Sequence, residues 1–289
     1  MSGKPIDILE RAAAHVGLDM NTATLLRDGA NAIVELSGGI VARIGPSASV
    51  AAADRELRVS QWLNASGIPT VEAMTTLPQP IVVEDRPVTW WHLIPDHRPA
   101  TPAELGAALA RLHALDPPTT FELPEYEPFS GLHDRIAAFG NDEREWLIRH
   151  YTSLRRQYEA LPPPARITVI HGDAWQGNLA VPADGTPIFL DLDKVSRGRP
   201  EWDLVQLAVD HADFTRLDTA AYRSFVTGYG GYDMISTPEF RIFADIQELR
   251  WVTFAIGLAH RDRAAAAEAR HRIACLRGHV AKPWEWRAL

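Results

Sequence analysis

Cysteine is almost absent from this chain, with a single residue, Cys275, among 289. One cysteine cannot form an intramolecular disulfide, so the fold has to be held together by its core. The first residues also lack the apolar stretch of a signal peptide. These two absences favour a protein of the reducing cytoplasm that is long enough to bury a core without covalent cross-links.

Long hydrophobic runs and blocks of basic residues are absent as well. The longest apolar runs, such as residues 251–259, are much shorter than the roughly 20 residues that cross a bilayer, so we expect no membrane span. The 29 basic and 37 acidic residues give a formal net charge of −8 without any Lys/Arg cluster. We therefore expect no nucleic acid partner, whereas small neutral or cationic ligands suit this balance. No feature of the sequence specifies an oligomeric state.

The first part of the chain has the alternating pattern of β-strands. Residues 22–45 alternate apolar and polar positions across two turn signals and predict a three-stranded meander. A helix is expected from about residue 49 to 64, followed by two more strands within residues 80–94. We therefore expect a small N-terminal lobe, rich in β-structure, over residues 1–95.

The pattern changes to helical periodicity after Pro95. Thr101, Pro102 and Glu104 form a capping-box sequence, which predicts a helix start at this point. Further helices are expected near residues 142–160, 201–212, 217–228, 238–262 and 264–277. Residues 96–289 should therefore form a larger and mostly helical domain.

One β-rich segment, residues 167–194, interrupts these helices. Asp184-Gly185 lies between apolar runs and predicts a hairpin with a two-residue turn. Counting outward from that turn pairs residue 179 with 190 and places Asn178 opposite Asp191. Opposed side chains have Cβ atoms roughly 5 Å apart, so an amide oxygen and a carboxylate could share one hard cation such as Mg²⁺. Asp173, in the loop before the hairpin, could reach a substrate and accept a proton.

The same segment has a second interpretation. Asp191 and Asp193 could form the DxD metal motif of a glycosyltransferase. Alternation along a strand would send the two side chains to opposite faces of the sheet, which disfavours a shared metal.

Several motifs occur together and in a characteristic order. His171-Gly172-Asp173 and Asn178 precede the hairpin, and residues 189–191 and 200–204 follow. In this combination the sequence resembles the aminoglycoside phosphotransferase and choline kinase group, within the protein-kinase-like fold. The resemblance implies an α+β, bilobal architecture. Its N-lobe would be a small antiparallel sheet with one main helix, and its C-lobe mostly helical with a catalytic β-hairpin.

The resemblance also implies roles for individual residues. Asp173 would be the catalytic base, and Asn178 and Asp191 would hold Mg²⁺ against the phosphates of ATP. The catalytic loop would be supported by His171 and Asp203. The nucleotide-binding residues would be Gly29, Asn31, Arg43, Glu56, Leu93 and Ile94.

The N-lobe departs from the family pattern at one strand. Family members usually have a lysine there, whereas residues 40–44 offer only Arg43. A guanidinium group can bind phosphate and pair with Glu56, but arginine and lysine are not interchangeable. Two functions therefore remain open: an ATP-dependent kinase of small molecules, and a catalytically weak nucleotide-binding pseudokinase. Retention of Asp173, Asn178 and Asp191 favours the kinase.

The acceptor site is expected on the helices after the hairpin. These helices carry acidic residues and one tryptophan: Asp210, Asp213, Asp245, Glu248 and Trp251. Carboxylates beside an aromatic ring suit a cationic or polyhydroxylated ligand, which predicts an amino sugar, an aminoglycoside or another hydroxylated amine as acceptor. The alternative is an acidic stripe that only faces solvent.

Overall fold

The computed structural model describes residues 4–29, 31–140, 143–260 and 262–289. The chain divides into two compact units. Unit 1 comprises Met1–Thr101 and Gln176–Val195, and unit 2 comprises Pro102–Trp175 and Ser196–Leu289. None of the helices in the described ranges is long and apolar enough to cross a membrane.

Unit 1 is built on an antiparallel five-stranded sheet with the strand order β1-β2-β3-β5-β4. The meander and the two later strands lie where the alternating pattern predicted them. The strands are β1 (Thr24–Asp28), β2 (Ala32–Leu36), β3 (Ile40–Ile44), β4 (Ile81–Val83) and β5 (Arg86–His92). Every second residue of β2 and β3 is buried, so one face of the sheet carries a continuous core.

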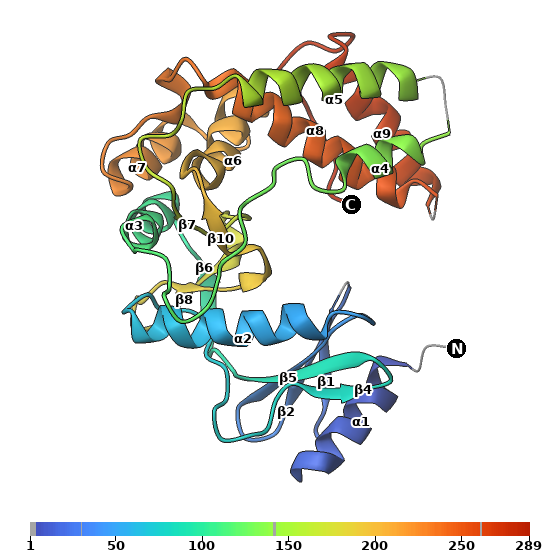
Figure 1. Cartoon of the computed structure of the whole chain (residues 1–289), viewed down its shortest axis with the longest axis vertical. Helices are drawn as coiled ribbons and strands as arrows, with labels where there is room; N and C mark the ends of the chain where they lie inside the picture. The colour runs from blue at the N-terminus through green and yellow to red at the C-terminus, as the bar shows by residue number, and fades with distance from the viewer. Residues whose placement is uncertain (1–3, 30, 141–142, 261) are drawn as a thin grey trace. The chain divides into compact units, whose positions relative to one another are not determined.

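Two helices cover the two faces of this sheet (Figure 1). Helix α1 (Pro5–Val16) packs Ile8 and Leu9 against the buried face, in one core with Trp90. Helix α2 (Val50–Ala65) contacts the other face through Leu57, beside Trp91. The expectation of one main helix in this lobe was therefore incomplete. Our strand-based interpretation of the first residues overlooked α1, although its buried positions have helical spacing.

The hairpin of unit 1 has a different register from the predicted one. Strands β8 (Leu179–Pro182) and β9 (Ile188–Phe189) pair residue 179 with 189, so the predicted pairing of 179 with 190 was wrong by one residue. The reason is the longer connection, residues 183–187, in which Asp184 accepts a hydrogen bond of 2.9 Å from the Thr186 amide. Asn178 ends the 3₁₀ turn η1 (Gln176–Asn178), and Asp191 precedes the turn η2 (Leu192–Lys194). They are not a cross-strand pair. Strand β8 also pairs with β6 (His97–Pro99).

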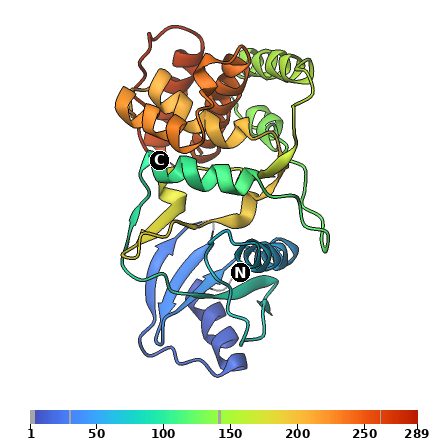
Figure 2. The same cartoon turned by 90° about the vertical axis from the view of Figure 1, so that its left-hand side faces the viewer.

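Unit 2 is mostly helical, and its main helices match the predicted ranges. Helix α3 begins at Pro102, directly after the predicted cap. The elements are α3 (Pro102–His113), α4 (Leu132–Ala137), α5 (Arg144–Glu159), β7 (Thr168–Ile170), β10 (Ser196–Gly198), α6 (Glu201–Ala212), α7 (Thr219–Gly228), η3 (Met234–Ser236), α8 (Phe240–Leu258) and α9 (Arg263–Leu276). Helix α8 contacts both α5 and α9, and the three lie side by side in both views (Figures 1 and 2). Strands β7 and β10 form a small antiparallel pair.

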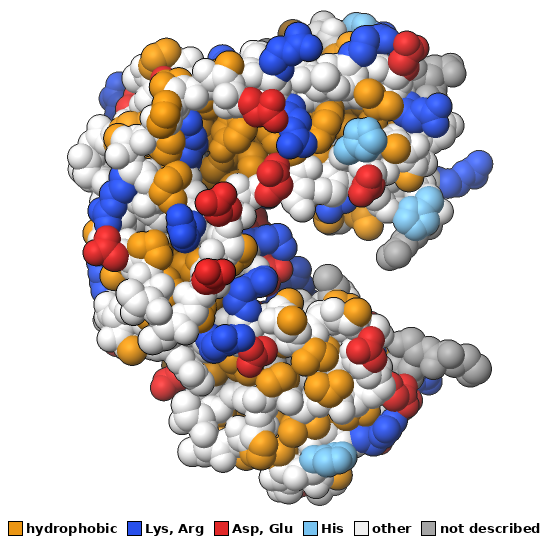
Figure 3. All heavy atoms as spheres, viewed as in Figure 1, with side chains coloured by type: hydrophobic (Ala, Val, Ile, Leu, Met, Phe, Trp, Pro, Cys, Tyr) orange, Lys and Arg blue, Asp and Glu red, His pale blue; other side chains and the backbone are white. Residues whose placement is uncertain are grey.

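Charged side chains are mixed on the visible surface. On the face drawn in Figure 3, basic and acidic groups alternate over each unit and do not gather by sign. This surface matches the absence of basic blocks from the sequence.

Helices α3 and α7 approach each other at two glycines. A Cβ atom added to Gly106 would lie 2.4 Å from the carbonyl oxygen of Phe225, and one added to Gly228 would lie 2.3 Å from that of Ala103. Neither helix can therefore carry a side chain at its contact point without moving the other backbone.

We expect Gly106→Ala to destabilise the protein by about 1–3 kcal/mol, because the overlap outweighs the better helix propensity of alanine. Urea unfolding would measure the change. Gly257→Ala in α8 is the matched control, because its new Cβ would meet only Arg135 Cδ at 4.0 Å. The close approach of α3 and α7 would be disproved if the two variants were equally stable.

Candidate active site

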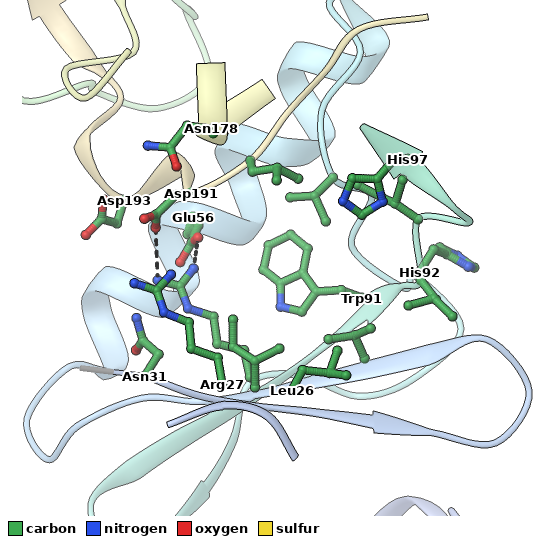
Figure 4. Close-up of a pocket in the computed structure, with 18 residues that line it drawn as sticks. Leu26, Arg27, Asn31, Glu56, Trp91, His92, His97, Asn178, Asp191 and Asp193 are labelled. Atoms are coloured by element: carbon green, nitrogen blue, oxygen red, sulfur yellow. Dashed lines mark hydrogen bonds and ion pairs between the residues drawn. The ribbon is translucent and has the colours of Figure 1, made fainter. Parts of the chain in front are cut away.

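Unit 1 contains a cavity of about 390 Å³ on the α2 side of its sheet (Figure 4). Its floor consists of strand residues, and the hairpin and the turns that flank it supply polar side chains. The residues that line it include Leu26, Arg27, Asn31, Ile33, Val41, Arg43, Glu56, Val71, Trp91, His92, Leu93, Ile94, His97, Asn178, Asp191 and Asp193. The cavity thus brings together segments that are far apart in the sequence.

Arg43, on β3, is the most connected side chain of this cavity. Its Nη1 donates to Glu56 on α2, and its Nη2 lies 3.6 Å from Oδ1 of Asp191. The amide oxygen of Asn31 accepts from Nη2 at 2.7 Å and from Nε at 3.2 Å. One guanidinium group therefore joins the α2 helix, the turn between β1 and β2, and the segment after the hairpin.

The contact with Arg43 favours the ionised form of Glu56. The residue is only 6% exposed. Burial raises the pKa of Glu56 to about 7, against the attraction of Arg43. The pair is the one that the sequence predicted, and both partners line the cavity.

Asn178, Asp191 and Asp193 lie on the hairpin side of the same cavity (Figure 4). The expectation that Asp191 and Asp193 would face opposite ways was wrong. Asp191 has a left-handed backbone, with φ of 53°, and a 3₁₀ turn follows it, so strand alternation does not apply. Oxygen ligands of this kind suit Mg²⁺. Within the described ranges, no cluster of three or more His, Cys, Asp or Glu forms a metal site.

The remaining predicted nucleotide residues are only partly at the cavity. Leu93 and Ile94 line it, whereas Gly29 lies in the turn beside it and is not among the lining residues. Trp91 was missed, although alternation could have found it. Trp90 is fully buried in the α1 core, so the next residue of the strand has to face the other side.

In unit 2, Asp203 on α6 anchors the segment that leads into Asp173. This carboxylate is fully buried and accepts backbone hydrogen bonds from His171 at 2.6 Å and from Gly172 at 2.7 Å. It also lies 2.9 Å from Nε2 of His113, a contact that the sequence did not suggest. The backbone that leads into Asp173 is therefore fixed by a charged group with several hydrogen bonds.

A second contact reaches the same loop. The hydroxyl group of Tyr126 donates to the carbonyl oxygen of Gly172 at 3.4 Å and accepts a hydrogen bond from Arg250. Burial lowers the pKa of Arg250 to about 10. No sequence motif marked these two residues, because they come from separate elements.

The acidic residues predicted to bind the acceptor form an ion-pair cluster in unit 2. Arg241 donates to Asp213 at 2.7 Å, to Glu248 at 3.3 Å, and to Asp245. Lys282 lies 2.7 Å from Asp213 and 3.4 Å from Glu248. These carboxylates are therefore neither a stripe facing solvent nor an open anionic wall.

Glu248 and Asp213 also interact with each other. Burial, together with the hydrogen bond to Asp213, raises the pKa of Glu248 to about 8. Burial raises the pKa of Asp213 too, but hydrogen bonds from Glu248, Lys282 and Arg241 outweigh it and leave the pKa below its usual value. Glu248 is therefore protonated over a wider pH range than an ordinary glutamic acid, and its protonated form can donate to Asp213.

The other two predicted acceptor residues have partners elsewhere in unit 2. Asp210 pairs with Arg216 at 3.0 Å. Trp251 packs edge-on against Phe214 and Trp286, and the Arg216 guanidinium lies 5.6 Å from its ring centroid.

Comparison with known proteins gives a family and a fold. A family model described as "Phosphotransferase enzyme family" matches residues 22–243. No curated protein sequence matches. Among solved structures, the amicoumacin kinase hAmiN is similar at 13% identity and a TM-score of 0.76, over 97% of this chain and 95% of that one.

Two other solved structures have the same fold. A choline/ethanolamine kinase family protein from Mesorhizobium loti has 18% identity and a TM-score of 0.65, with 96% of each chain covered. The aminoglycoside phosphotransferase APH(3'')-Id from Streptomyces rimosus has 22% identity and a TM-score of 0.60, with 84% of this chain and 96% of that chain covered. These likenesses agree with the α+β, kinase-like fold that the motifs predicted.

We expect Asp203→Asn to destabilise the protein by about 3 kcal/mol, because an amide cannot replace a buried charge that accepts from two backbone groups and a histidine. Chemical denaturation measures the change. Asp218→Asn is the matched control, because Asp218 caps α7 and asparagine caps equally well. If the Asp203 variant were as stable as the control, the carboxylate would not anchor the loop.

The raised pKa of Glu248 predicts that the free energy of unfolding depends on pH. The unfolded chain loses this proton near pH 4.5 and the folded chain only near 8, so the free energy of unfolding should fall as pH rises between these values. One group contributes at most about 1.4 kcal/mol per pH unit. Glu248→Gln should lower this slope in urea titrations from pH 5 to 8 without abolishing it, because burial also raises the pKa of Glu56 into this range. The exposed Glu145→Gln should leave it unchanged. A Glu248→Gln curve parallel to that of the wild type would contradict the raised pKa of Glu248.

Proposed function

The chain belongs to the phosphotransferase enzyme family, and we propose that it transfers the γ-phosphoryl group of ATP to a hydroxyl group of a small molecule. The observation that carries this proposal is the unit 1 cavity, where Arg43, Asn178 and Asp191 come together in a space of about 390 Å³. Its apolar floor suits a base, and its polar side suits phosphates and a cation.

Asn178 and Asp191 are the proposed holders of Mg²⁺. Their side chains offer one amide oxygen and one carboxylate, which are hard ligands that fit this ion. When bound, the cation neutralises charge on the phosphates. Two side chains supply few of the six ligands that Mg²⁺ takes, so the phosphates of the nucleotide would contribute to the coordination, and nucleotide and metal should bind together.

Asp173 is the proposed base. The acceptor oxygen forms a bond to the γ-phosphorus while the bond from that phosphorus to the bridging oxygen of ADP breaks. The hydroxyl proton passes to the Asp173 carboxylate. Asp203 has a positioning role in this scheme, because its bonds to His171 and Gly172 fix the backbone before the base.

The proposed acceptor is an amino sugar, an aminoglycoside or a similar hydroxylated compound. The names of the similar structures, an amicoumacin kinase and an aminoglycoside phosphotransferase, support this class. The acidic residues support it less directly. A cationic acceptor would have to compete with Arg241 and Lys282 for Asp213, or bind Asp245, whose side chain is 36% exposed.

A second function, nucleotide binding with little turnover, has one observation in its favour. Arg43 replaces the family's lysine and is already engaged by Glu56, Asn31 and Asp191. The two functions differ in a direct measurement. Both predict a thermal shift with ATP and Mg²⁺, but only the kinase converts an acceptor from a panel of aminoglycosides, amino alcohols and sugars into a phosphate ester.

We expect Asp173→Asn to lower kcat by about 10²-fold or more on the acceptor that the panel identifies, with an almost unchanged Kd for ATP, because the lost carboxylate accepts the proton and does not bind phosphate. Mass spectrometry of the phosphorylated acceptor and calorimetry with an ATP analogue would test both parts. Asp134→Asn, at a side chain that is 93% exposed, is the control. A variant with wild-type kcat would remove Asp173 from the reaction.

A further inference from the structure

Two arginines line the cavity of unit 1, and within the described ranges only one of them is paired. Arg43 is held by Glu56, Asn31 and Asp191. No ion pair or side-chain hydrogen bond within the described ranges engages Arg27, which lines the same cavity from β1. Figure 4 shows Arg27 extending from the sheet toward the side of the cavity where Glu56 and Asp191 lie.

A β-bulge puts Arg27 on this face of the sheet. The pairing of β1 with β2 places Leu25 opposite Val34 and Arg27 opposite Ile33, with Leu26 as the additional residue. Without the bulge, Leu26 would oppose Ile33 and Arg27 would oppose Ala32, which is 2% exposed in the α1 core. Since a shift of one residue moves a side chain to the opposite face, the bulge turns Arg27 from the core side to the cavity side.

The register continues across the sheet and relates the two arginines. Ile33, opposite Arg27, is itself opposite Arg43 on β3. Directly opposed residues share a face, so the two arginines flank Ile33 on the cavity side. Two strand spacings separate their backbones by about 10 Å, a gap that two long side chains can bridge around one ligand.

The charge balance of the cavity leaves Arg27, and not Arg43, available to bind phosphate. Three carboxylates, those of Glu56, Asp191 and Asp193, line the cavity against two guanidinium groups. Arg43 already neutralises two of these acids. A polyphosphate entering this cavity therefore meets one guanidinium with free donors, and arginine binds phosphate oxygens with paired donors.

We propose that Arg27 binds the phosphate groups of the nucleotide, while Arg43 holds Glu56 and Asp191 in place. This inference rests on the proposed function, because it assumes that a nucleotide polyphosphate occupies the cavity. In this proposal, Arg27 on β1 and Arg43 on β3 together have the two roles that a single lysine usually has in the family.

The first test compares ligands with and without phosphates. Arg27→Gln should weaken binding of a non-hydrolysable ATP analogue about tenfold or more, because a charge-assisted contact is lost. Binding of adenosine, which has no phosphate, should change less than about twofold. Arg58→Gln is the control, because it removes the same charge from an α2 side chain that is 53% exposed and pairs with Asp54. Calorimetry with each ligand gives the dissociation constants.

A second test places an arginine at neighbouring positions of β1 in the variant that lacks Arg27. Leu25 and Leu26 are 56% and 51% exposed, so either position accepts an arginine. In the Arg27→Gln background, Leu26→Arg should restore part of the affinity for the ATP analogue, because Leu26 also lines the cavity. Leu25→Arg has the same net charge but lies opposite Val34, on the other face, and should restore none.

The outcomes separate this inference from the function on which it rests. If the wild type binds the analogue and Arg27→Gln binds it equally well, or if Leu25→Arg and Leu26→Arg restore affinity alike, Arg27 is not a phosphate ligand and the kinase assignment stands. If the wild type binds no ATP analogue at all, the proposed function fails and this inference fails with it.

Discussion

The guanidinium group of Arg43 is the interaction on which the site of unit 1 depends. It is 15% exposed, and it reaches a helix, a turn and the segment after the hairpin through Glu56, Asn31 and Asp191. A buried cation stays in place only while its partners remain, and removing one partner of such a pair costs about 3–5 kcal/mol. A lysine would offer three donors from one nitrogen, whereas the planar guanidinium group spreads its donors over three nitrogens and reaches partners that lie farther apart. The position of Asp191 therefore follows from the residue on β3.

In unit 2, a buried negative charge has the role that the buried positive charge of Arg43 has in unit 1. Asp203 is a fully buried carboxylate that gathers the amides of His171 and Gly172 and the ring of His113. In both units a buried charge satisfies groups from several segments and thereby fixes a backbone or side-chain position. Such a charge costs desolvation energy, which its hydrogen bonds offset only when all of them are made.

Local patterns predicted most of the fold, and their failures have physical reasons. Alternation and capping signals located the meander, α2, α3 and the later helices because these signals are contained in short windows. The hairpin register failed because a longer loop and a two-residue turn can share the same Asp-Gly sequence. The relation of Asp191 to Asp193 depends on one left-handed residue, and the direction of Arg27 depends on one bulge. No hydrophobic pattern reports either feature, because the first is the backbone conformation of a single residue and the second is an irregularity in the pairing of β1 with β2.

The absence of the usual lysine is weak evidence against catalysis once the whole cavity is considered. A lysine on β3 would both pair with Glu56 and neutralise phosphate. Here the first task is done by Arg43, and the bulge of β1 brings a second cation to the same face. The charge available to a nucleotide is the sum over all strands that face it, so a single strand position cannot decide between kinase and pseudokinase. In this fold, strand register carries functional information that a residue-by-residue motif does not contain.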